Sequence, residues 1–137
     1  MDLAETWQLF DQLAADVRCA VLEHDGRGGG SRPGQYALDI VADDIVVPRL
    51  VGAGFGVMSE ESGTHHADRE VCVVVDPVDG STNASRGLPS WAISLCAVDE
   101  QGLWAATVAD LSTSTTYRAA RGLGASRDGA PIVVAAS

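Results

Sequence analysis

A run of five apolar residues from Val71 to Val75 constrains the fold of this chain more than any other feature. Four of the five are valine, a β-branched residue that favours strands. Because polar and apolar positions do not alternate along the run, we expect a strand that is buried on both faces. Such a strand belongs in the interior of a sheet.

Two carboxylates follow the expected strand directly, at Asp76 and Asp79. Each has an ordinary explanation, because Asp before proline and Asp before glycine both occur in turns. Together at the end of a buried strand, however, they repel each other and need a cation to compensate them. Gly80 lets a ligand approach the backbone, and Ser81 and Thr82 add N–H and hydroxyl donors. The segment therefore suits metal-assisted phosphate chemistry.

Hydrophobic spacing predicts helices first and strands afterwards. Apolar residues three and four apart predict an amphipathic helix from Leu3 to Val21. Asp43 or Asp44 can cap a second helix, which ends before Gly52. Further strands are expected at residues 55–59, 91–98, 103–109, 115–120 and 131–135. Helices that flank a run of strands predict an α+β fold with a largely antiparallel sheet.

Glycines and polar residues mark two expected loops, at residues 25–34 and 61–70. Gly28 to Gly30 follows no strand, so it is not a dinucleotide-binding fingerprint. His65 and His66 are adjacent in the second loop, where their side chains point in different directions. We therefore favour a solvated loop over a metal site for this pair.

The three cysteines, Cys19, Cys72 and Cys96, lie far apart in apolar surroundings. We interpret them as small buried side chains rather than as a metal or redox site. Reduced thiols fit a cytoplasmic location. The same location is expected because the N-terminus lacks a signal-peptide pattern and no apolar run reaches the roughly 20 residues of a membrane span.

Nineteen acidic residues against nine basic ones give the chain a formal net charge of -10. This balance argues against binding to a nucleic-acid backbone. It also means that an anionic substrate needs metal ions between its own charges and those of the protein. A length of 137 residues, 46% of them hydrophobic, fits one globular domain.

Three segments resemble motifs of the inositol monophosphatase family. Residues 76–83, Asp-Pro-Val-Asp-Gly-Ser-Thr-Asn, are similar to that family's Asp-Pro-Ile-Asp-Gly-Thr-Thr-Asn motif. Residues 58–63, which include Glu60 and Glu61, resemble its Gly-Glu-Glu-Ser segment. Residues 38–43 resemble its Asp-x-Val-Thr-x-x-Asp segment. Three matches in the right order form a specific signal.

The resemblance implies a magnesium-dependent, lithium-sensitive type of phosphatase that hydrolyses a small phosphate monoester without a phosphoenzyme. It implies one Mg²⁺ held by Glu60, Asp76 and the Val78 carbonyl, and a second Mg²⁺ shared by Asp76 and Asp79. The resemblance selects Glu60 over Glu61. Neighbours at a strand end face opposite ways, so only one of the two should enter the site.

The same resemblance implies the catalytic and substrate-binding groups. Glu60 and the Ser81 hydroxyl would orient the attacking water, and Asp43 would support that water as an outer acid. The residues that would bind the substrate phosphate are Asp79, Gly80, Ser81 and Thr82.

The chain departs from the family motifs at several positions. The spacing from Asp39 to Asp43 is shorter than the family's, and we assign the outer acid to Asp43 rather than Asp44 because its apolar successors then match the family pattern. Ala84 replaces an aromatic residue, which loosens the pocket wall. Gln35-Tyr36 stands where family members often carry a lysine, which removes a positive charge near the phosphate.

The resemblance covers only the N-terminal half of the family's αβαβα sugar-phosphatase fold, so residues 1–137 are expected to form that half alone. The family's second half carries a Trp-Asp-x-Ala-Ala-like motif, whereas Trp7, Trp91 and Trp104 are followed here by Gln, Ala and Ala. A sheet left uncovered in this way is expected to cause homo-oligomerisation or another association.

Two functions are compatible with these features. The first is hydrolysis of an inositol monophosphate-like ester, which would be weak or lost in the shortened chain. The second is a catalytically weak metal- or phosphate-binding module with a structural or regulatory role. In both cases the partner is a small phosphorylated metabolite, and inositol phosphate, histidinol phosphate, fructose bisphosphate and nucleotide 3′-phosphates all stay open.

Overall fold

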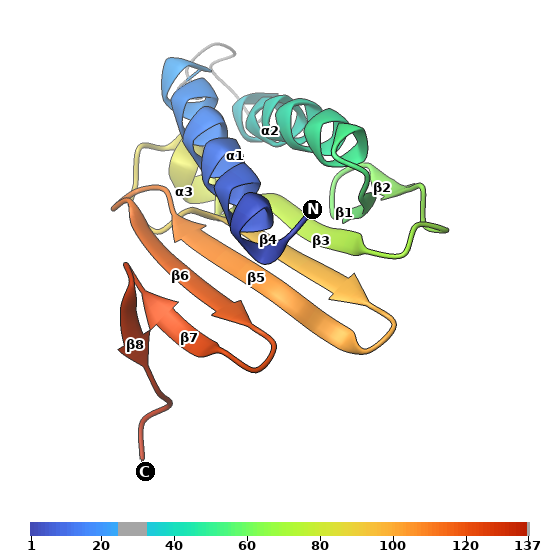
Figure 1. Cartoon of the computed structure of the whole chain (residues 1–137). Coiled ribbons are helices and arrows are strands. Elements are labelled where there is room, and N and C mark those ends of the chain that lie inside the picture. The colour runs from blue at the N-terminus through green and yellow to red at the C-terminus, as the bar shows by residue number, and fades with distance from the viewer. Residues whose placement is uncertain (25–32, 137) are drawn as a thin grey trace.

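The described part of the chain forms three helices and one sheet of eight strands (Figure 1). The structure, a computed structural model, describes residues 1–24 and 33–136, with the backbone alone for residues 33–36. In chain order the elements are α1 Leu3–His24, α2 Pro33–Gly52, β1 Gly56–Ser59, β2 Gly63–His65, β3 Cys72–Asp79, α3 Ser81–Ser85, β4 Ala92–Asp99, β5 Gly102–Asp110, β6 Thr115–Ala120, β7 Gly124–Arg127 and β8 Ala130–Ile132.

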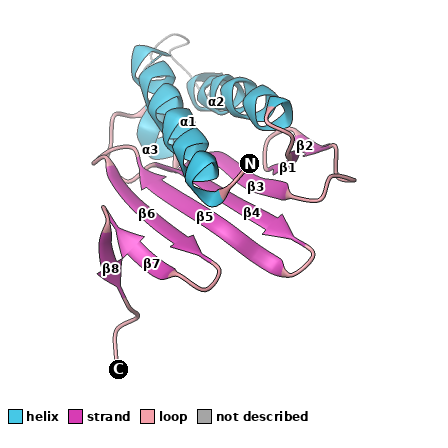
Figure 2. Cartoon of the chain, in the orientation of Figure 1, coloured by secondary structure: helices cyan, strands magenta, loops and turns pink. Residues whose placement is uncertain are grey.

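The strands follow the order β2-β1-β3-β4-β5-β6-β7-β8 across the sheet (Figure 2). From β3 to β8 each strand pairs antiparallel with the next one along the chain. β1 and β3 instead pair in parallel, with Val57 opposite Val73. The prediction of an α+β fold with a largely antiparallel sheet is therefore confirmed.

The two long helices lie on the same side of the sheet (Figure 1). Helix α1 begins at Leu3 as predicted and buries the apolar stripe that its spacing indicated. The core lies between the helices and the sheet, and its fully buried side chains include Phe10, Leu13, Val17, Val57, Val73, Ile93 and Leu95.

Helix α2 begins at Pro33, so the prediction that Asp43 or Asp44 caps it is wrong. Residues four apart along this helix have no exposed surface, and they are Leu38, Ala42, Val46 and Leu50. This buried stripe extends N-terminally past Asp43. The helix extends with it, because helices in proteins owe most of their stability to the packing of an apolar face.

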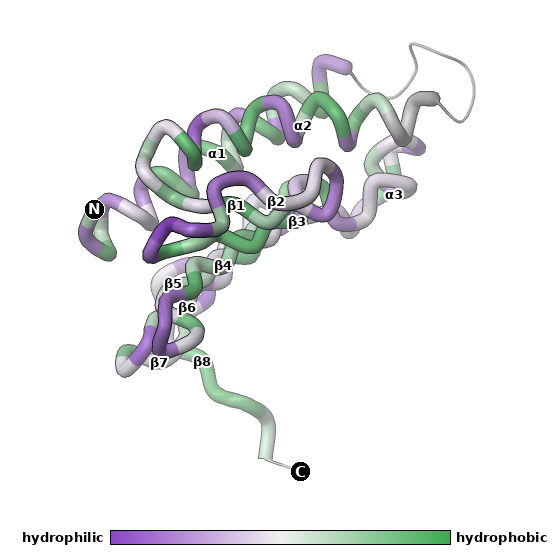
Figure 3. Tube along the Cα trace, turned by 90° about the vertical axis from the view of Figure 1, so that its right-hand side faces the viewer, coloured by the Kyte–Doolittle hydropathy of each residue, from purple (hydrophilic) through white to green (hydrophobic). Residues whose placement is uncertain are grey.

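No described element covers the opposite side of the sheet (Figure 3). Val74, in the middle of the run that predicted two buried faces, is 45% exposed there. Met58 lies opposite Val74 in the parallel pair, and Val108 and Tyr117 lie opposite each other on β5 and β6. All four side chains are exposed, and together we call them the open face. The prediction of a strand buried on both faces is therefore wrong, because only alternate residues of β3 pack against the helices.

Strands β4, β5 and β6 lie where they were predicted, whereas three other strands differ. β2 lies inside the predicted loop at residues 61–70, β7 was not predicted, and β8 ends at Ile132. No residue of β2 or β7 is buried, so neither sequence carries the alternation that predicts a strand. Backbone pairing with β1 and β6 forms these two strands.

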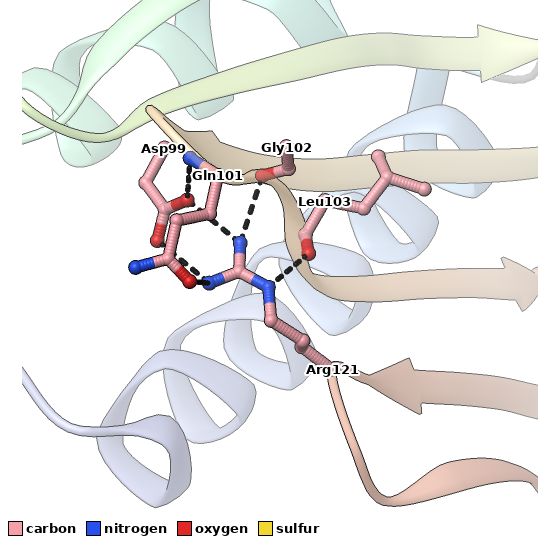
Figure 4. A network of polar contacts seen from close by, with 5 residues as sticks. All are labelled: Asp99, Gln101, Gly102, Leu103 and Arg121. Carbon is pink, nitrogen blue, oxygen red and sulfur yellow. Dashed lines mark hydrogen bonds and ion pairs between the residues drawn. The ribbon is translucent and has the colours of Figure 1, made fainter.

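Arg121, directly after β6, holds the turn between β4 and β5 (Figure 4). Its Nη2 donates to Asp99 Oδ1 at 2.7 Å and to the Gly102 carbonyl at 3.1 Å, and its Nε donates to the Leu103 carbonyl at 3.0 Å. The hydrogen bond from Arg121 is the main reason why the pKa of Asp99 lies below its usual range. This turn lies at the far end of β4 from Ala92, the residue that pairs with Asp79.

Candidate functional site

Two strand ends and one helix bring four carboxylates together. β1 and β3 run in parallel with Ser59 opposite Val75, so the residues that follow them come side by side at the same edge of the sheet. The Glu60 N–H donates to the Val75 carbonyl at 3.1 Å, which extends the pairing by one residue beyond β1. The four acids are Glu60 after β1, Asp76 and Asp79 on β3, and Asp39 on α2.

These acids repel one another, and the effect is largest at Asp76. Burial, a hydrogen bond with Glu60 and the charges of Glu60, Asp79 and Asp39 raise the pKa of Asp76 to about 7. Burial also raises the pKa of Asp39, where a hydrogen bond with Ser81 opposes it and the charge of Glu60 adds to it. The other three carboxylates are therefore close enough to Asp76 to disfavour its charged form.

The four carboxylates are suitable ligands for a divalent cation, although their side chains do not lie close enough together to bind one without moving. Within residues 1–24 and 33–136, no three His, Cys, Asp or Glu side chains are close enough together to hold a metal ion. Salt bridges in the same part of the chain pair Arg49, Arg118 and Arg121 with acids outside this group. Carboxylate oxygens are the ligands that Mg²⁺ prefers, and a cation would relieve the repulsion at Asp76. The acids therefore fit Mg²⁺, and their side chains have to close around the ion to bind it.

A left-handed glycine joins Asp79 to helix α3. Gly80 has a φ of 88°, and a Cβ there would lie 2.6 Å from the Ser90 carbonyl oxygen and 3.2 Å from Trp91 Cα. Asn83 Nδ2 donates to the same Ser90 carbonyl at 3.2 Å. The turn at Gly80 between β3 and α3, which we call the elbow, is thus packed against the loop before β4. Only glycine fits there without moving the backbone of that loop. Packing is a second reason for this glycine, beside the close approach of a ligand that the sequence indicated.

Asp39 is the site residue that sequence analysis did not select. Its carboxylate forms a hydrogen bond with Ser81 and feels the charge of Glu60. Asp43 instead is 6% exposed and accepts a hydrogen bond from Ser59 Oγ, and Asp44 is exposed to solvent. One feature of the sequence could have indicated Asp39. The spacing from Asp39 to Asp43 is shorter than in the family motif, so either residue could correspond to the acid that the motif places on the helix.

The other predicted residues lie around the elbow. Ser81 and Thr82 open helix α3, directly after Gly80. Val78 is 5% exposed, and the pairing of β3 with β4 shifts its register between Asp76 and Asp79. The Val78 carbonyl therefore lies in an irregular stretch of β3, and its role as a metal ligand stays a prediction.

Glu60 and Glu61 are both exposed, so exposure does not distinguish them, and the selection of Glu60 over Glu61 stays a prediction. Burial and the charges of Asp39, Glu60 and Asp43 raise the pKa of Glu61. Glu61 therefore lies within electrostatic reach of the site, although its side chain faces solvent.

The cysteines differ from their predicted burial. All three are free thiols, and Cys19 is exposed whereas Cys72 and Cys96 are half-buried. The interpretation as buried side chains is therefore wrong. Cys72 begins β3, whereas Cys96 lies in the middle of β4, opposite the exposed Val74, where one side of the sheet has no covering element.

The histidines and two further segments add little to the site. His65 ends β2, and its Nε2 lies 2.8 Å from Ser62 Oγ. Gly28 to Gly30 lies outside the described residues. So do the side chains of Gln35 and Tyr36.

A cavity of about 460 Å³ adjoins the carboxylates on the uncovered side of the sheet. Glu60 and Asp76 line it together with Met58 and Val74 of the open face. Glu60 and Asp76 therefore adjoin the part of the open face that Met58 and Val74 form.

Comparison with known proteins gives three consistent findings. A model of the inositol monophosphatase family matches residues 35–137. A Methanocaldococcus jannaschii protein named fructose-1,6-bisphosphatase/inositol-1-monophosphatase is 30% identical over 135 residues, which cover 93% of this chain and 54% of that protein. A Thermococcus kodakarensis protein of the same name is 52% identical over 58 residues, or 42% of this chain and 23% of that protein.

The solved structures agree with the sequence comparison. An extragenic suppressor from Pyrococcus furiosus superimposes with a TM-score of 0.88 at 27% identity, over 98% of this chain and 57% of that structure. The chain thus spans about half the length of this structure and of the Methanocaldococcus jannaschii relative, and a smaller part of the Thermococcus kodakarensis relative.

Proposed function

Because the chain belongs to the inositol monophosphatase family, we propose that it hydrolyses a small phosphate monoester with the help of Mg²⁺. The observation that carries this proposal is the group of repelling carboxylates that raises the pKa of Asp76 to about 7. A divalent cation removes such repulsion, so the group favours binding of one. The adjoining elbow offers backbone and hydroxyl donors for a phosphate.

The chain's own oxygens would hold two ions. Glu60, Asp76 and the Val78 carbonyl would hold the first, and Asp76 and Asp79 would hold the second. When bound there, Mg²⁺ makes water more acidic and neutralises charge on the leaving oxygen. Glu60 accepts a hydrogen bond from the attacking water and keeps it beside the phosphate.

Asp39 replaces Asp43 as the outer acid in this proposal. The support is the hydrogen bond between Asp39 and Ser81. A hydroxyl that donates to a carboxylate keeps its lone pairs for another partner. Ser81 therefore presents its oxygen to the water, and Asp39 fixes the direction of the Ser81 hydroxyl.

The proposed substrate is a small phosphorylated metabolite similar to inositol monophosphate. The N–H groups of Gly80 and Ser81, with the Thr82 hydroxyl, bind the phosphate oxygens, and Asp79 adjoins the leaving group. The name of the Methanocaldococcus jannaschii relative supports two substrates, an inositol monophosphate and fructose 1,6-bisphosphate. A second function is a metal- and phosphate-binding module without turnover, since the same carboxylates and backbone donors could bind both ligands without hydrolysing the ester.

A phosphate-release assay distinguishes these two functions. With Mg²⁺, the purified chain is expected to hydrolyse inositol 1-phosphate and fructose 1,6-bisphosphate orders of magnitude more slowly than the longer relatives. The reason is that the 137 residues assayed match only about half the length of such a relative, and groups that position a substrate are worth several kcal/mol of barrier. Release should require high Mg²⁺, stop with EDTA and discriminate poorly between the two esters.

Glu60→Gln serves as the blank in this assay, because it removes a proposed ligand and keeps the size of the side chain. Phosphate release no faster than the blank, together with intact Mg²⁺ binding, would favour the module. Fast and selective turnover at low Mg²⁺ would show that the rest of the relatives' fold is dispensable.

We also propose that the open face associates with a second copy of the chain. An exposed apolar patch of this kind marks an interaction surface. Light scattering is expected to give a mass that rises with concentration, despite the net charge of -10. Val108→Lys places a charge within the patch and should shift the protein to monomer. Leu22→Lys, at a residue 50% exposed on α1, is the matched control and should not. A concentration-independent monomeric mass for the unaltered chain would contradict this association.

None of the described helices has the length and apolar character needed to cross a membrane. We place the proposed reaction in the cytoplasm, because three free thiols fit a reducing compartment. The acidic charge also disfavours nucleic acid as a partner.

A further inference from the structure

Asp43 and Ser59 form a buried polar pair directly behind the carboxylates. Each residue is 6% exposed, and the Ser59 hydroxyl donates a hydrogen bond to Asp43 Oδ1. Burying a carboxylate is costly unless hydrogen bonds compensate it. The proposed reaction has no step for this pair, so its position next to Glu60 needs another explanation.

The oxygen of Ser59 closes the turn that carries Glu60. It accepts hydrogen bonds from the Glu61 N–H at 3.1 Å and the Ser62 N–H at 3.4 Å. Serine hydroxyls often stabilise turns in this way. Because the Glu60 N–H donates to the Val75 carbonyl at 3.1 Å, the backbone is held on both sides of the Glu60 side chain.

Asp43 ties the same turn to helix α2. Asp39 and Asp43 are four residues apart, so they lie one turn apart on one face of the helix. When the hydrogen bond at Asp43 holds helix α2 in place, it also fixes the position of Asp39 relative to Ser81, the hydrogen-bond partner of Asp39. The single bond from Ser59 to Asp43 therefore links the helix that carries Asp39 to the turn that carries Glu60.

We infer that Asp43 and Ser59 are positioning residues, which hold Glu60 and Asp39 at the separation that the metal-dependent site needs. This inference rests on the proposed function of the same site. Partners that stand behind metal ligands commonly change metal affinity 10- to 100-fold when they are removed. Asp43 thus acts through Ser59 rather than on the attacking water.

Four variants test the pair. Ser59→Ala removes the hydroxyl, and Asp43→Leu removes the acceptor at nearly constant size. Asp43→Asn keeps an oxygen that can accept the Ser59 hydrogen, so it is the conservative rescue. Arg121→Ala lowers stability at the far end of β4 and controls for destabilisation alone.

Two readouts are taken on each variant: amide hydrogen exchange by NMR in the metal-free chain, and Mn²⁺ affinity by calorimetry. Ser59→Ala and Asp43→Leu are expected to speed exchange at Glu61 and Ser62 at least tenfold relative to core amides, and to weaken Mn²⁺ binding about 10- to 100-fold. Asp43→Asn should restore most of both values, and Arg121→Ala should change neither.

The outcomes separate this inference from the proposed function. Unchanged exchange at Glu61 and Ser62, or unchanged Mn²⁺ affinity, in Ser59→Ala overturns the positioning role. Failure of the unaltered chain to bind Mn²⁺ overturns the proposed function and, with it, the purpose assigned to the pair. Faster exchange in Ser59→Ala would then still establish that the pair orders the Glu60 turn.

Discussion

Asp76→Asn is expected to stabilise the metal-free protein and to abolish its stabilisation by Mg²⁺. Burial and the neighbouring acids raise the pKa of Asp76 from 3.8 to about 7. At neutral pH, folding therefore brings this carboxylate into surroundings that disfavour its charge. An amide carries no charge, and we expect a gain of about 1 kcal/mol in the free energy of unfolding, because solvent screens part of the repulsion.

The pH dependence follows from the same raised pKa. Between pH 3.8 and about 7, native Asp76 binds a proton that the unfolded chain has released. Rising pH in this window therefore lowers the stability of the unaltered protein through this group. Asp76→Asn lacks that contribution, so its stability advantage should grow as the pH rises towards 7 and vanish below about 4.

With Mg²⁺ bound, the unaltered protein should become more stable than Asp76→Asn, the reverse of their order without the metal. The unaltered chain gains about 2.7 kcal/mol when free Mg²⁺ exceeds the dissociation constant roughly a hundredfold. Asp76→Asn loses a ligand that both proposed ions share, so it should gain almost nothing. Urea unfolding with and without Mg²⁺ measures both effects. Glu100→Gln removes one negative charge from the exposed β4–β5 turn and is the matched control. Equal Mg²⁺ shifts in Asp76→Asn and the unaltered chain would contradict the assignment.

Gly80→Ala is expected to be the most damaging of the single substitutions described. The φ of 88° strains any residue that has a Cβ, at a cost of about 1–2 kcal/mol. The new Cβ would also lie 2.6 Å from the Ser90 carbonyl oxygen, so the loop before β4 has to move. Overpacking of this kind costs about 1–3 kcal/mol more. The expected total is about 2–5 kcal/mol in the free energy of unfolding.

Gly122→Ala isolates the first part of this cost, the backbone strain. Gly122 has a φ of 78°, but nothing lies within 4 Å of a Cβ placed there. Its substitution should therefore show the backbone strain alone. Chemical unfolding of both variants gives the difference, which measures the contact with Ser90. If the two variants lose equal stability, the elbow is not tightly packed against this loop.

The sequence predicts the parts of the fold in which side-chain pattern and burial agree. Strands β4 and β5 alternate between buried and partly exposed positions, so their hydrophobic period is visible. Strand β6 has no buried residue, but Thr115, Thr116 and Tyr117 are residue types that favour strands. Strands β2 and β7 have no buried residue and depend on backbone pairing, which leaves no pattern to read. The start of α2 was misplaced because Asp43 is a good cap by residue type, whereas its burial inside the helix depends on Ser59.

The candidate site divides in the same way. Glu60, Asp76 and Asp79 could be selected because they adjoin strand ends within recognisable motifs. Asp39 could not, because its relation to Ser81 arises only when α2 packs beside α3. The exposure of Val74 was equally hidden, since a run of valines gives no sign of whether one or two layers cover the strand.

The parallel pairing of β1 and β3 affects the order in which the chain folds. Strands β4 to β8 meet only their neighbours in sequence through short turns, and such local contacts form quickly. The parallel pair and the packing of α2 join more distant segments, so the carboxylates should come together late. An ion that binds only the completed site stabilises the native state and not the folding transition state. Mg²⁺ should therefore slow unfolding and leave the rate of folding almost unchanged.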